Sequence, residues 1–400
     1  MAFPLLFSAL LATAIGQSVV LTILPSLGRD TGLSEIQVAI MMSASAFIFA
    51  LGTTLWSRFA RKKGYKFTLM MGLTGYTLGT ALYAGVWSFG YSGLLSGTVL
   101  FIALLVSRSL QSTIMSATPP SAVGYAIAIS APDKRVGAIS KVTSANNLGQ
   151  IVGPAYAGLL AGFGLLTPLY TIVLLTLCAL VVIWWKLPVL SPQQAGSSQA
   201  HQPQAEPGQV RGITPILIGT CAALFCCMAM MQQTLGFFFI DHYHFTTVEA
   251  AQHVGVAMMC TAAASLGIQL LVVQRARIRS QSMIYLSLPL LVSAYLVMFI
   301  HQSLAVLYVA MVMMGAGMGM AYPSVAAVAT SYCHPDRQAT VTGMITATPA
   351  MGYIVGPPIA AWLYGYGQRW PFLCASLLLV FFILLVSVAL RTLKAQEATR

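Results

Sequence analysis

The sequence predicts an all-α membrane protein whose twelve transmembrane helices form two pseudo-symmetric bundles of six. Of its 400 residues, 58% are hydrophobic and 7% are charged, whereas soluble domains are roughly 25% charged. Apolar runs of about 20 residues, the length of a helix that crosses a bilayer, recur from end to end. A transmembrane β-barrel is excluded because its strands would show alternating segments of about 10 residues.

An internal repeat predicts the division into two bundles. A constant shift of 203 residues aligns segment 131–164 with segment 334–367 without a gap. A match of this length indicates two copies of one structural unit. The positions that pair glycine or proline in both copies include Gly149 with Gly352, Gly153 with Gly356, and Pro154 with Pro357.

The first-half helices are expected at about 3–25, 34–58, 67–88, 97–129, 137–162 and 167–188. The first run lacks a basic leader, so we expect a spanning helix rather than a cleaved signal peptide, with Arg29 and Asp30 in the following loop. The second begins at a serine cap, Ser34, with an acid in its first turn. Pro119 and Pro120 predict a kink or break in the long fourth helix.

The second-half helices are expected at about 213–239, 247–273, 280–300, 303–332, 338–364 and 369–391. Thr246 and Glu249 form a capping-box pattern ahead of the second of these. The polar, Gln/Pro/Ser-rich segment 189–211 is predicted to be a flexible cytoplasmic linker. The predicted domains are therefore bundle 1–188, linker 189–211, and bundle 212–400 with a short cytoplasmic tail.

The net charge of +12 is explained by membrane orientation rather than by nucleic-acid binding. Seventeen of the twenty Lys and Arg residues lie in every second connection or at the C-terminus. The opposite connections hold only Arg29 and Arg369. Because basic residues mark cytoplasmic loops, we expect both termini in the cytoplasm. We expect the chain to lie in a bacterial inner membrane. We also expect it to be a monomer.

Two motifs resemble those of the major facilitator superfamily. The segment 52–66 resembles its signature between helices 2 and 3 at Gly52 and Gly64, although Arg61 stands where that family has an aspartate. The segment from Gly149 through Gly153 and Pro154 to Gly158 resembles the glycine motif of drug:proton antiporters. The resemblance implies the MFS fold, an exporter, and protons as coupling ions. It also implies that the two segments control conformation. Because the acid is missing, the closed cytoplasmic side must be held differently, through Arg58 or through a helix terminus.

The glycine motif has a second interpretation that needs no family. Small residues four apart let helices approach closely, so the motif is equally expected as a packing seam between the two halves.

Arg108 is the one charge predicted well inside the membrane, where ionisable residues are functional candidates. It is expected either to attract an anionic group of the substrate or to be a structural arginine bonded to backbone or Gln17. Gln111 shares its helix face. Further polar candidates for substrate binding are Gln17, Asn146, Asn147, Gln150, Gln232, Gln233 and Tyr353. Asp241, near the outer face, and Arg108 are candidates for proton coupling.

These features predict a secondary transporter of a small organic molecule that works by alternating access. We expect efflux of an anion, for example a carboxylate siderophore, or of an amphipathic drug-like molecule. Two alternatives remain open: an uptake permease for an organic anion or sugar-like solute, and a non-transporting sensor. The sequence predicts no enzyme activity, cofactor or metal site, and it contains no Walker-type ATP motif.

Overall fold

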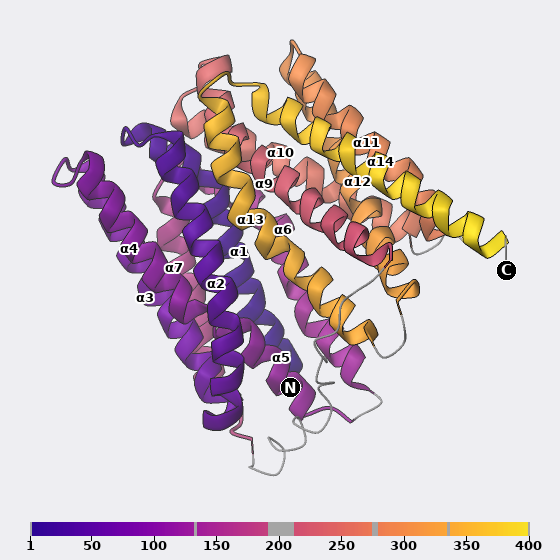
Figure 1. Ribbon diagram of the computed structural model, residues 1–400. Helices are drawn as coiled ribbons and strands as arrows, with labels where there is room; N and C mark the ends of the chain where they lie inside the picture. Colours follow the sequence, from indigo (N-terminus) through magenta and orange to yellow (C-terminus); the bar gives the residue numbers. More distant parts are fainter. Residues whose placement is uncertain (1, 132–133, 191–211, 274–278, 334–336, 399–400) are drawn as a thin grey trace. The chain divides into compact units, whose positions relative to one another are not determined.

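The computed structural model describes residues 2–131, 134–190, 212–273, 279–333 and 337–398, and their regular secondary structure is entirely helical (Figure 1). The helices of the first half are α1 (Ala2–Asp30), α2 (Glu35–Lys63), α3 (Tyr65–Tyr91), α4 (Gly97–Met115), α5 (Thr118–Ala128), α6 (Arg135–Ala161) and α7 (Thr167–Lys186). Those of the second half are α9 (Thr214–Tyr243), α10 (Thr247–Ile268), continued by a π-helical turn (Gln269–Val273), α11 (Ser280–Ile300), α12 (Leu304–Ser331), α13 (Gln338–Tyr364) and α14 (Trp370–Ala398).

With α4 and α5 counted as one span, these helices confirm the predicted plan of six and six. Within the described residues, nine spans are long and apolar enough to cross a membrane. The spans outside that set are α3, α6 and α13. Helices α6 and α13 carry the repeated glycine motif, so their lower hydropathy reflects small and polar residues rather than a soluble environment.

Several helix ends were predicted from caps and breakers, and most agree with the structure. Ser34 accepts from the backbone N–H of Gln37 and forms a full capping box at the start of α2. Thr246 and Glu249 bond reciprocally at the start of α10. The expected end of the first helix near Pro25 was wrong, because α1 continues through Pro25 to Asp30. A single proline removes one backbone donor, which membrane helices tolerate.

The predicted break at Pro119–Pro120 is present in the first half and absent from the second. Helix α4 ends at Met115, and α5 restarts at Thr118 with prolines in its first turn. The repeat partner of Pro120 is Pro323, which lies inside the continuous helix α12. The number of prolines does not by itself decide the break, because Pro357 and Pro358 are adjacent inside the continuous helix α13.

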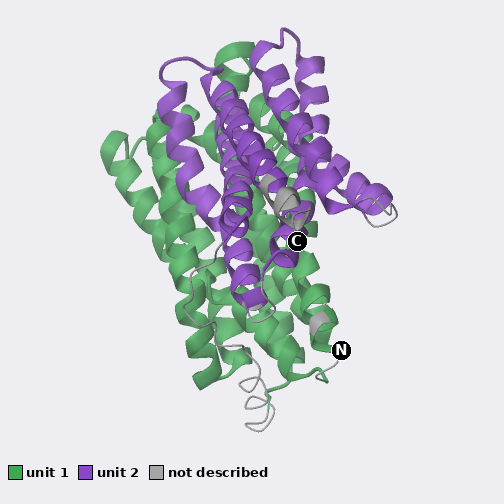
Figure 2. Cartoon of the chain, turned by 45° about the vertical axis from the view of Figure 1, so that its right-hand side comes forward, with its two compact units in different colours: residues 1–202, 236–256 green, residues 203–235, 257–400 purple. Residues whose placement is uncertain are grey.

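The chain forms two compact units (Figure 2). One comprises residues 1–202 and 236–256, and the other comprises residues 203–235 and 257–400. The end of α9 and the start of α10 therefore pack with the helices of the first half. The predicted linker lies, from residue 191 to 211, outside the described residues.

In the first unit, α1 packs along α6, while α3 packs against α4 and α7. Apolar side chains of α1, α3, α5, α6 and α7 form its core near the N-terminus, including Leu6, Leu69, Tyr125, Val142 and Ile183. In the second unit, α11 packs against α12 and α14. Gly317 of α12 lies beside Leu291 of α11, where a Cβ would approach the leucine to 2.6 Å.

Candidate functional site

Arg108 lies at the start of a hydrogen-bonded chain that joins α4 to α3. Its Nη1 donates to Gln111 Oε1 at 2.5 Å, one helical turn away. The Nε2 of Gln111 donates to Thr80 Oγ1 at 2.6 Å, and Thr80 donates to the backbone oxygen of Tyr76 at 2.7 Å. The close approach of α3 to α4 depends on Gly79, where a Cβ would lie 2.6 Å from Cγ of Gln111.

An aromatic side chain of α3 supports the guanidinium from another side. The Cζ of Arg108 lies 5.8 Å from the centroid of the Tyr83 ring, within the range of a cation–π contact. The Tyr83 ring packs edge-on against Trp87. These contacts hold the arginine in one position without neutralising its charge.

No carboxylate of the described residues pairs with Arg108, although its side chain is only 6% exposed. A cation at this depth costs about 3 kcal/mol on insertion scales. Within the described part of the chain, Arg108 makes one hydrogen bond, from Nη1 to Gln111, and no acceptor bonds to its Nε or Nη2. Arg108 thus retains donors that an anion can accept from.

The expected structural partners of Arg108 were wrong. Gln17 donates instead to Sδ of Met115 at 3.7 Å, which ties α1 to α4. No backbone oxygen of the described residues accepts from the guanidinium. The arginine is held by the side chain of Gln111 and by the Tyr83 ring of α3, and neither side chain is charged.

The repeated glycines form seams inside each half rather than between the halves. A Cβ at Gly153 would lie 2.5 Å from Cβ of Ser18 on α1. A Cβ at Gly352 would lie 2.5 Å from the carbonyl carbon of Phe225 on α9. Gly149 likewise contacts α1, and Gly356 contacts α9. The expected seam between halves is therefore wrong for these four glycines.

The C-terminal end of the motif does contact the other half of the sequence. Gly158 lies against Gln252 and Gly255 of α10, within the first unit. A Cβ at Gly255 would lie 2.6 Å from the backbone oxygen of Pro154. Pro154 and Pro357 stand inside unbroken helices, α6 and α13.

The polar candidates of α6 do not converge on Arg108. Asn147 and Gln150 are exposed and Asn146 is half-buried. The backbone oxygen of Gln150 accepts from Ser18 Oγ at 3.4 Å, but its side-chain amide has no hydrogen bond to the described residues.

In the second unit, α9 and α13 bring two candidates together. The Tyr353 hydroxyl donates to Gln232 Oε1 at 2.7 Å. Gln232 in turn donates to Sδ of Met258 at 3.7 Å. Gln233 is buried, with 1% of its surface exposed.

Asp241 takes part in a charge cluster at the end of α1, which the sequence did not predict. Arg29 bonds to Asp241 of α9 and to Glu35 of α2, the latter at 2.5 Å. The guanidinium also lies 5.1 Å from the Phe237 ring centroid. All these residues belong to the first unit. The cluster ties three helix ends together at one point.

The loop between α2 and α3 follows the glycine positions of its motif. Gly64 has a φ of 100°, a left-handed conformation that favours glycine. Gly52 is buried beside Ser116. Arg58 is exposed and Arg61 half-buried, and neither makes a hydrogen bond or ion pair with the described residues.

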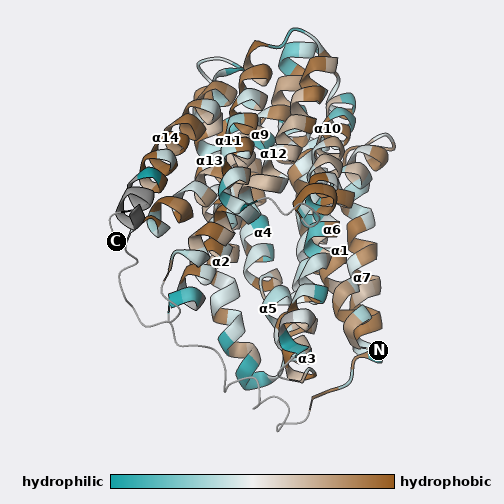
Figure 3. Cartoon of the chain, turned by 90° about the vertical axis from the view of Figure 1, so that its right-hand side faces the viewer, coloured by the Kyte–Doolittle hydropathy of each residue, from teal (hydrophilic) through white to brown (hydrophobic). Residues whose placement is uncertain are grey.

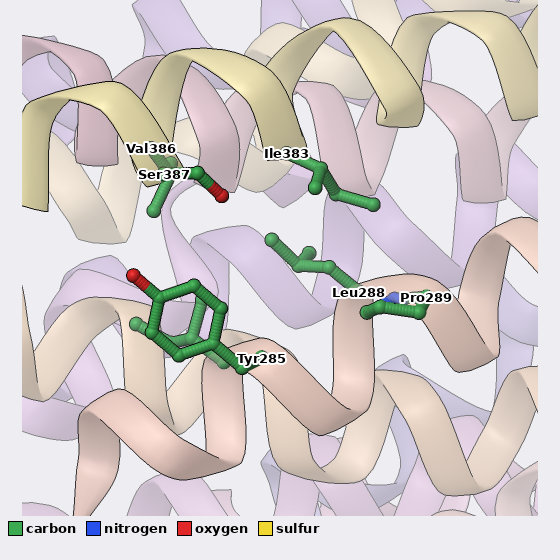
Figure 4. A pocket seen from close by; sticks show the side chains of 7 residues that line it. Tyr285, Leu288, Pro289, Ile383, Val386 and Ser387 are labelled. Carbon is green, nitrogen blue, oxygen red and sulfur yellow. The ribbon is translucent and has the colours of Figure 1, made fainter. Parts of the chain in front are cut away.

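A small cavity lies between α11 and α14, away from every candidate residue. It is lined by Ile284, Tyr285, Leu288, Pro289, Ile383, Val386 and Ser387 (Figure 4). Its volume is about 20 Å³, and its lining is almost wholly apolar. It is too small and too apolar to hold an organic anion.

The sequence did not predict a role at the site for Thr80, Tyr83 or Arg29, because the residues that they contact lie on other helices. A signal for the first two was present, since Thr80, Tyr83 and Trp87 recur at helical spacing on one face of α3. A polar and aromatic stripe of this kind marks a surface that meets a polar neighbour.

Comparison with known proteins agrees with this architecture. The family model described as Major Facilitator Superfamily matches residues 6–348 and 276–400. A curated relative, Solute carrier family 22 member 18 of Rattus norvegicus, is 25% identical over 198 residues, or 49% of this chain. The match spans 46% of that relative, less than half its length.

Three solved structures share the fold. A bacterial homolog of the human lysosomal transporter Spinster has a TM-score of 0.75 at 14% identity, over 98% of this chain and 96% of its own. The nucleoside transporter NupG has a TM-score of 0.75 at 14% identity, over 98% and 99%. The human organic anion transporter MFSD10 has a TM-score of 0.65 at 18% identity, over 96% and 98%.

Proposed function

The chain belongs to the Major Facilitator Superfamily and is a multi-pass membrane transporter, and we propose that it exports a small organic anion from the cytoplasm. Export proceeds by alternating access in exchange for protons, as in the antiporter branch that the motif from Gly149 to Gly158 resembles. The exporter lies in a bacterial inner membrane with both termini in the cytoplasm, as the distribution of basic residues favours.

The buried Arg108 is the observation that supports an anionic substrate. Its charge has no carboxylate partner among the described residues, and a carboxylate or similar anion would neutralise it with charge-assisted hydrogen bonds. The organic anion transporter MFSD10 shares the fold and is consistent with this substrate class. A carboxylate siderophore is one concrete candidate, because it carries several such groups.

A metabolite comparison tests this function against its alternatives. Three cultures are grown separately: cells with the protein, cells without it, and cells producing Arg108→Ala. Anions are measured in the cells and in the medium of each culture. Export predicts a carboxylate-bearing compound that is enriched in the medium only when the intact protein is present. Depletion of the compound from the medium would instead indicate uptake, and unchanged media would indicate a sensor.

Proton coupling is proposed for Asp241, the acid that Arg29 joins to α1. Asp241→Asn removes a titratable group from this cluster, so accumulation driven by a pH gradient is expected to fall to background. Exchange of substrate at equal pH should persist, because the substrate site is unchanged. Both rates are measured in proteoliposomes.

Glu35→Gln is the matched control for Asp241→Asn, since Glu35 is the other carboxylate bonded to Arg29. It should retain gradient-driven accumulation. If Asp241→Asn lost gradient-driven accumulation and exchange at equal pH to the same extent, the residue would have only a structural role.

A further inference from the structure

An open pocket of about 500 Å³ lies in the second unit, where the connection between α13 and α14 meets the end of α11. It is lined by Phe299 and by residues 367–370. Arg108 belongs to the other unit, and none of the substrate-binding candidates lines this pocket. Substrate binding therefore does not explain its polar residues.

Arg369 places a positive charge in this pocket, at the end of the helices where basic residues are rare. The connections at this end hold only Arg29 and Arg369, whereas seventeen Lys and Arg residues lie in the opposite connections or at the C-terminus. Arg29 is bound by Glu35 and Asp241 within the first unit. The bias in basic residues that orients the chain disfavours an arginine at position 369, so its presence needs another cause.

The acids of the second unit all belong by sequence to its other end. They are Glu206 in the linker, Asp336 in the connection before α13, and Glu397 in the C-terminal tail. At the pocket end this unit has two connections, residues 301–303 and 365–369, and Arg369 is their one Lys, Arg, Asp or Glu. The pocket end of the unit therefore has a net positive charge, which attracts anions.

The guanidinium of Arg369 is held in a defined position. Its Nη1 donates to the backbone oxygen of Phe299 at 3.2 Å, which links the connection between α13 and α14 to the end of α11. The side chain is half-buried. A guanidinium has five N–H donors, and this bond to a neutral carbonyl uses one of them.

Gln368 and Trp370 add polar groups to the same pocket. Neither the Gln368 amide nor the Trp370 indole N–H makes a hydrogen bond with a described residue. The Trp370 ring lies against Gly367, where a Cβ would approach Cδ1 to 2.5 Å, so glycine lets the indole form a wall of the pocket. A guanidinium, an amide N–H and an indole N–H together suit the oxygens of a phosphate group.

Aromatic side chains border the pocket, as they do where a bilayer meets water. Tyr366, directly before Gly367, is exposed, and its ring centroid lies 5.1 Å from that of the exposed Trp362. Ile300, directly after Phe299, is also exposed. These side chains place the pocket at the level of the lipid head groups.

An apolar stripe on α14 leads from the pocket along the helix. Its exposed members recur at the spacing of one helix face and are Leu377, Phe381, Leu384 and Val388. Trp370 precedes Leu377 by about two helical turns and so lies on the same face. The span that begins at Trp370 is the most apolar of the nine candidate spans, and Figure 3 shows the body of α14 largely in hydrophobic colours. Acyl chains would be covered along this face.

The internal repeat shows that the polar residues of the pocket are not needed to form the helix. Shifted by 203 residues, segment 368–370 corresponds to Leu165, Leu166 and Thr167 in the first half. Helix α7 begins at Thr167 just as α14 begins at Trp370. The same connection and helix start form without an arginine, so its presence in one copy points to a ligand.

We propose that this pocket binds the phosphate group of an anionic phospholipid, such as phosphatidylglycerol, in the leaflet opposite the basic connections. The phosphate oxygens accept from the Arg369 guanidinium and from the Gln368 and Trp370 N–H groups, and the acyl chains follow the apolar stripe of α14. A zwitterionic head group fits less well, because its ammonium would meet a positive charge and no acid of this end of the unit. The site goes beyond the proposed export and does not depend on which molecule is transported.

The test compares equivalent positions of the two halves. Tyr366→Cys, beside the pocket, and Phe163→Cys, its repeat equivalent, are each introduced into full-length protein whose seven native cysteines are replaced. Both native side chains are exposed. A fluorophore on the cysteine is then quenched in nanodiscs by phosphatidylglycerol or phosphatidylcholine that carries a nitroxide near the head group.

Phosphatidylglycerol should be enriched over phosphatidylcholine about fivefold beside Tyr366→Cys, the effect of about one basic residue near an anionic lipid. Little enrichment is expected beside Phe163→Cys. Adding Arg369→Gln should lower the first value to the second, whereas Arg369→Lys should retain part of it. Trp370→Phe keeps the ring but loses the N–H, so the enrichment should fall by about half.

Arg391→Gln is the matched control for charge, because Arg391 is exposed near the other end of the same helix. It should leave the enrichment beside Tyr366→Cys unchanged. Equal enrichment at the two labelled positions, or full enrichment in monodisperse Arg369→Gln protein, would overturn the proposal. Loss of the enrichment on adding inorganic phosphate at constant ionic strength would show a site for free phosphate rather than lipid. Failure of the proposed function is distinguishable, because quenching requires no transport.

Discussion

Arg108→Ala is expected to reduce transport of the anionic substrate about one hundredfold, equivalent to about 3 kcal/mol. The substitution removes the unpaired cation and its free donors, while the bond between Gln111 and Thr80 remains to hold α3 and α4 together. Folding should not suffer, because a buried charge that is costly to insert is lost. Transport is measured in proteoliposomes, and folded yield by size-exclusion chromatography.

Arg108→Lys is the control for charge alone. It keeps a cation but loses the planar fork that binds carboxylates through two hydrogen bonds. We therefore expect intermediate transport, with a raised KM. Near-normal transport by well-folded Arg108→Ala would remove this residue from the substrate site and, with it, the main support for an anionic substrate.

Gly153→Ala and Gly352→Ala are expected to destabilise the protein by about 1–3 kcal/mol each. The new Cβ would meet Ser18 in the first case and the backbone of Phe225 in the second, both at 2.5 Å. Both obstacles are fixed by the backbone, because the Ser18 atom is its Cβ, so losses of similar size are expected for the two variants. The apparent melting temperature in detergent reports the change.

The same two helices provide matched controls. Among the residues that the structure describes, no neighbouring atom lies within 4 Å of a Cβ added at Gly137 of α6 or Gly343 of α13. Alanine favours helix over glycine by up to about 1 kcal/mol, so Gly137→Ala and Gly343→Ala should be neutral or stabilising. If all four variants melted alike, the close packing of the glycine seams would not contribute to stability.

The predictions from sequence succeeded where a local pattern controls the outcome. Bilayer-length apolar runs identified the helices, and the cap at Ser34 and the prolines at 119–120 located a start and a break. The end of α1 was misplaced because hydropathy records where apolar residues stop, whereas the helix continues as long as its backbone hydrogen bonds can form.

The candidate site was predictable only in part, for the same reason. Arg108 was identified as a charge inside an apolar run, and Gln111 from its position one turn later on the same helix. Thr80 and Tyr83 could not be assigned, because their contact with Arg108 requires α3 and α4 to lie side by side. The pairing of Arg29 with Asp241 joins residues more than 200 positions apart.

Membrane insertion, the internal duplication and the presence of one charge within a span follow from the residues alone, because hydropathy and repetition are properties of the chain. Tertiary structure alone decided that Gly153 packs on α1 rather than across the two halves, and that Arg108 contacts α3 and no carboxylate of the described residues. Small residues permit close approach to any helix, and a guanidinium bonds whichever acceptor is near. The partner is selected only when the helices assemble.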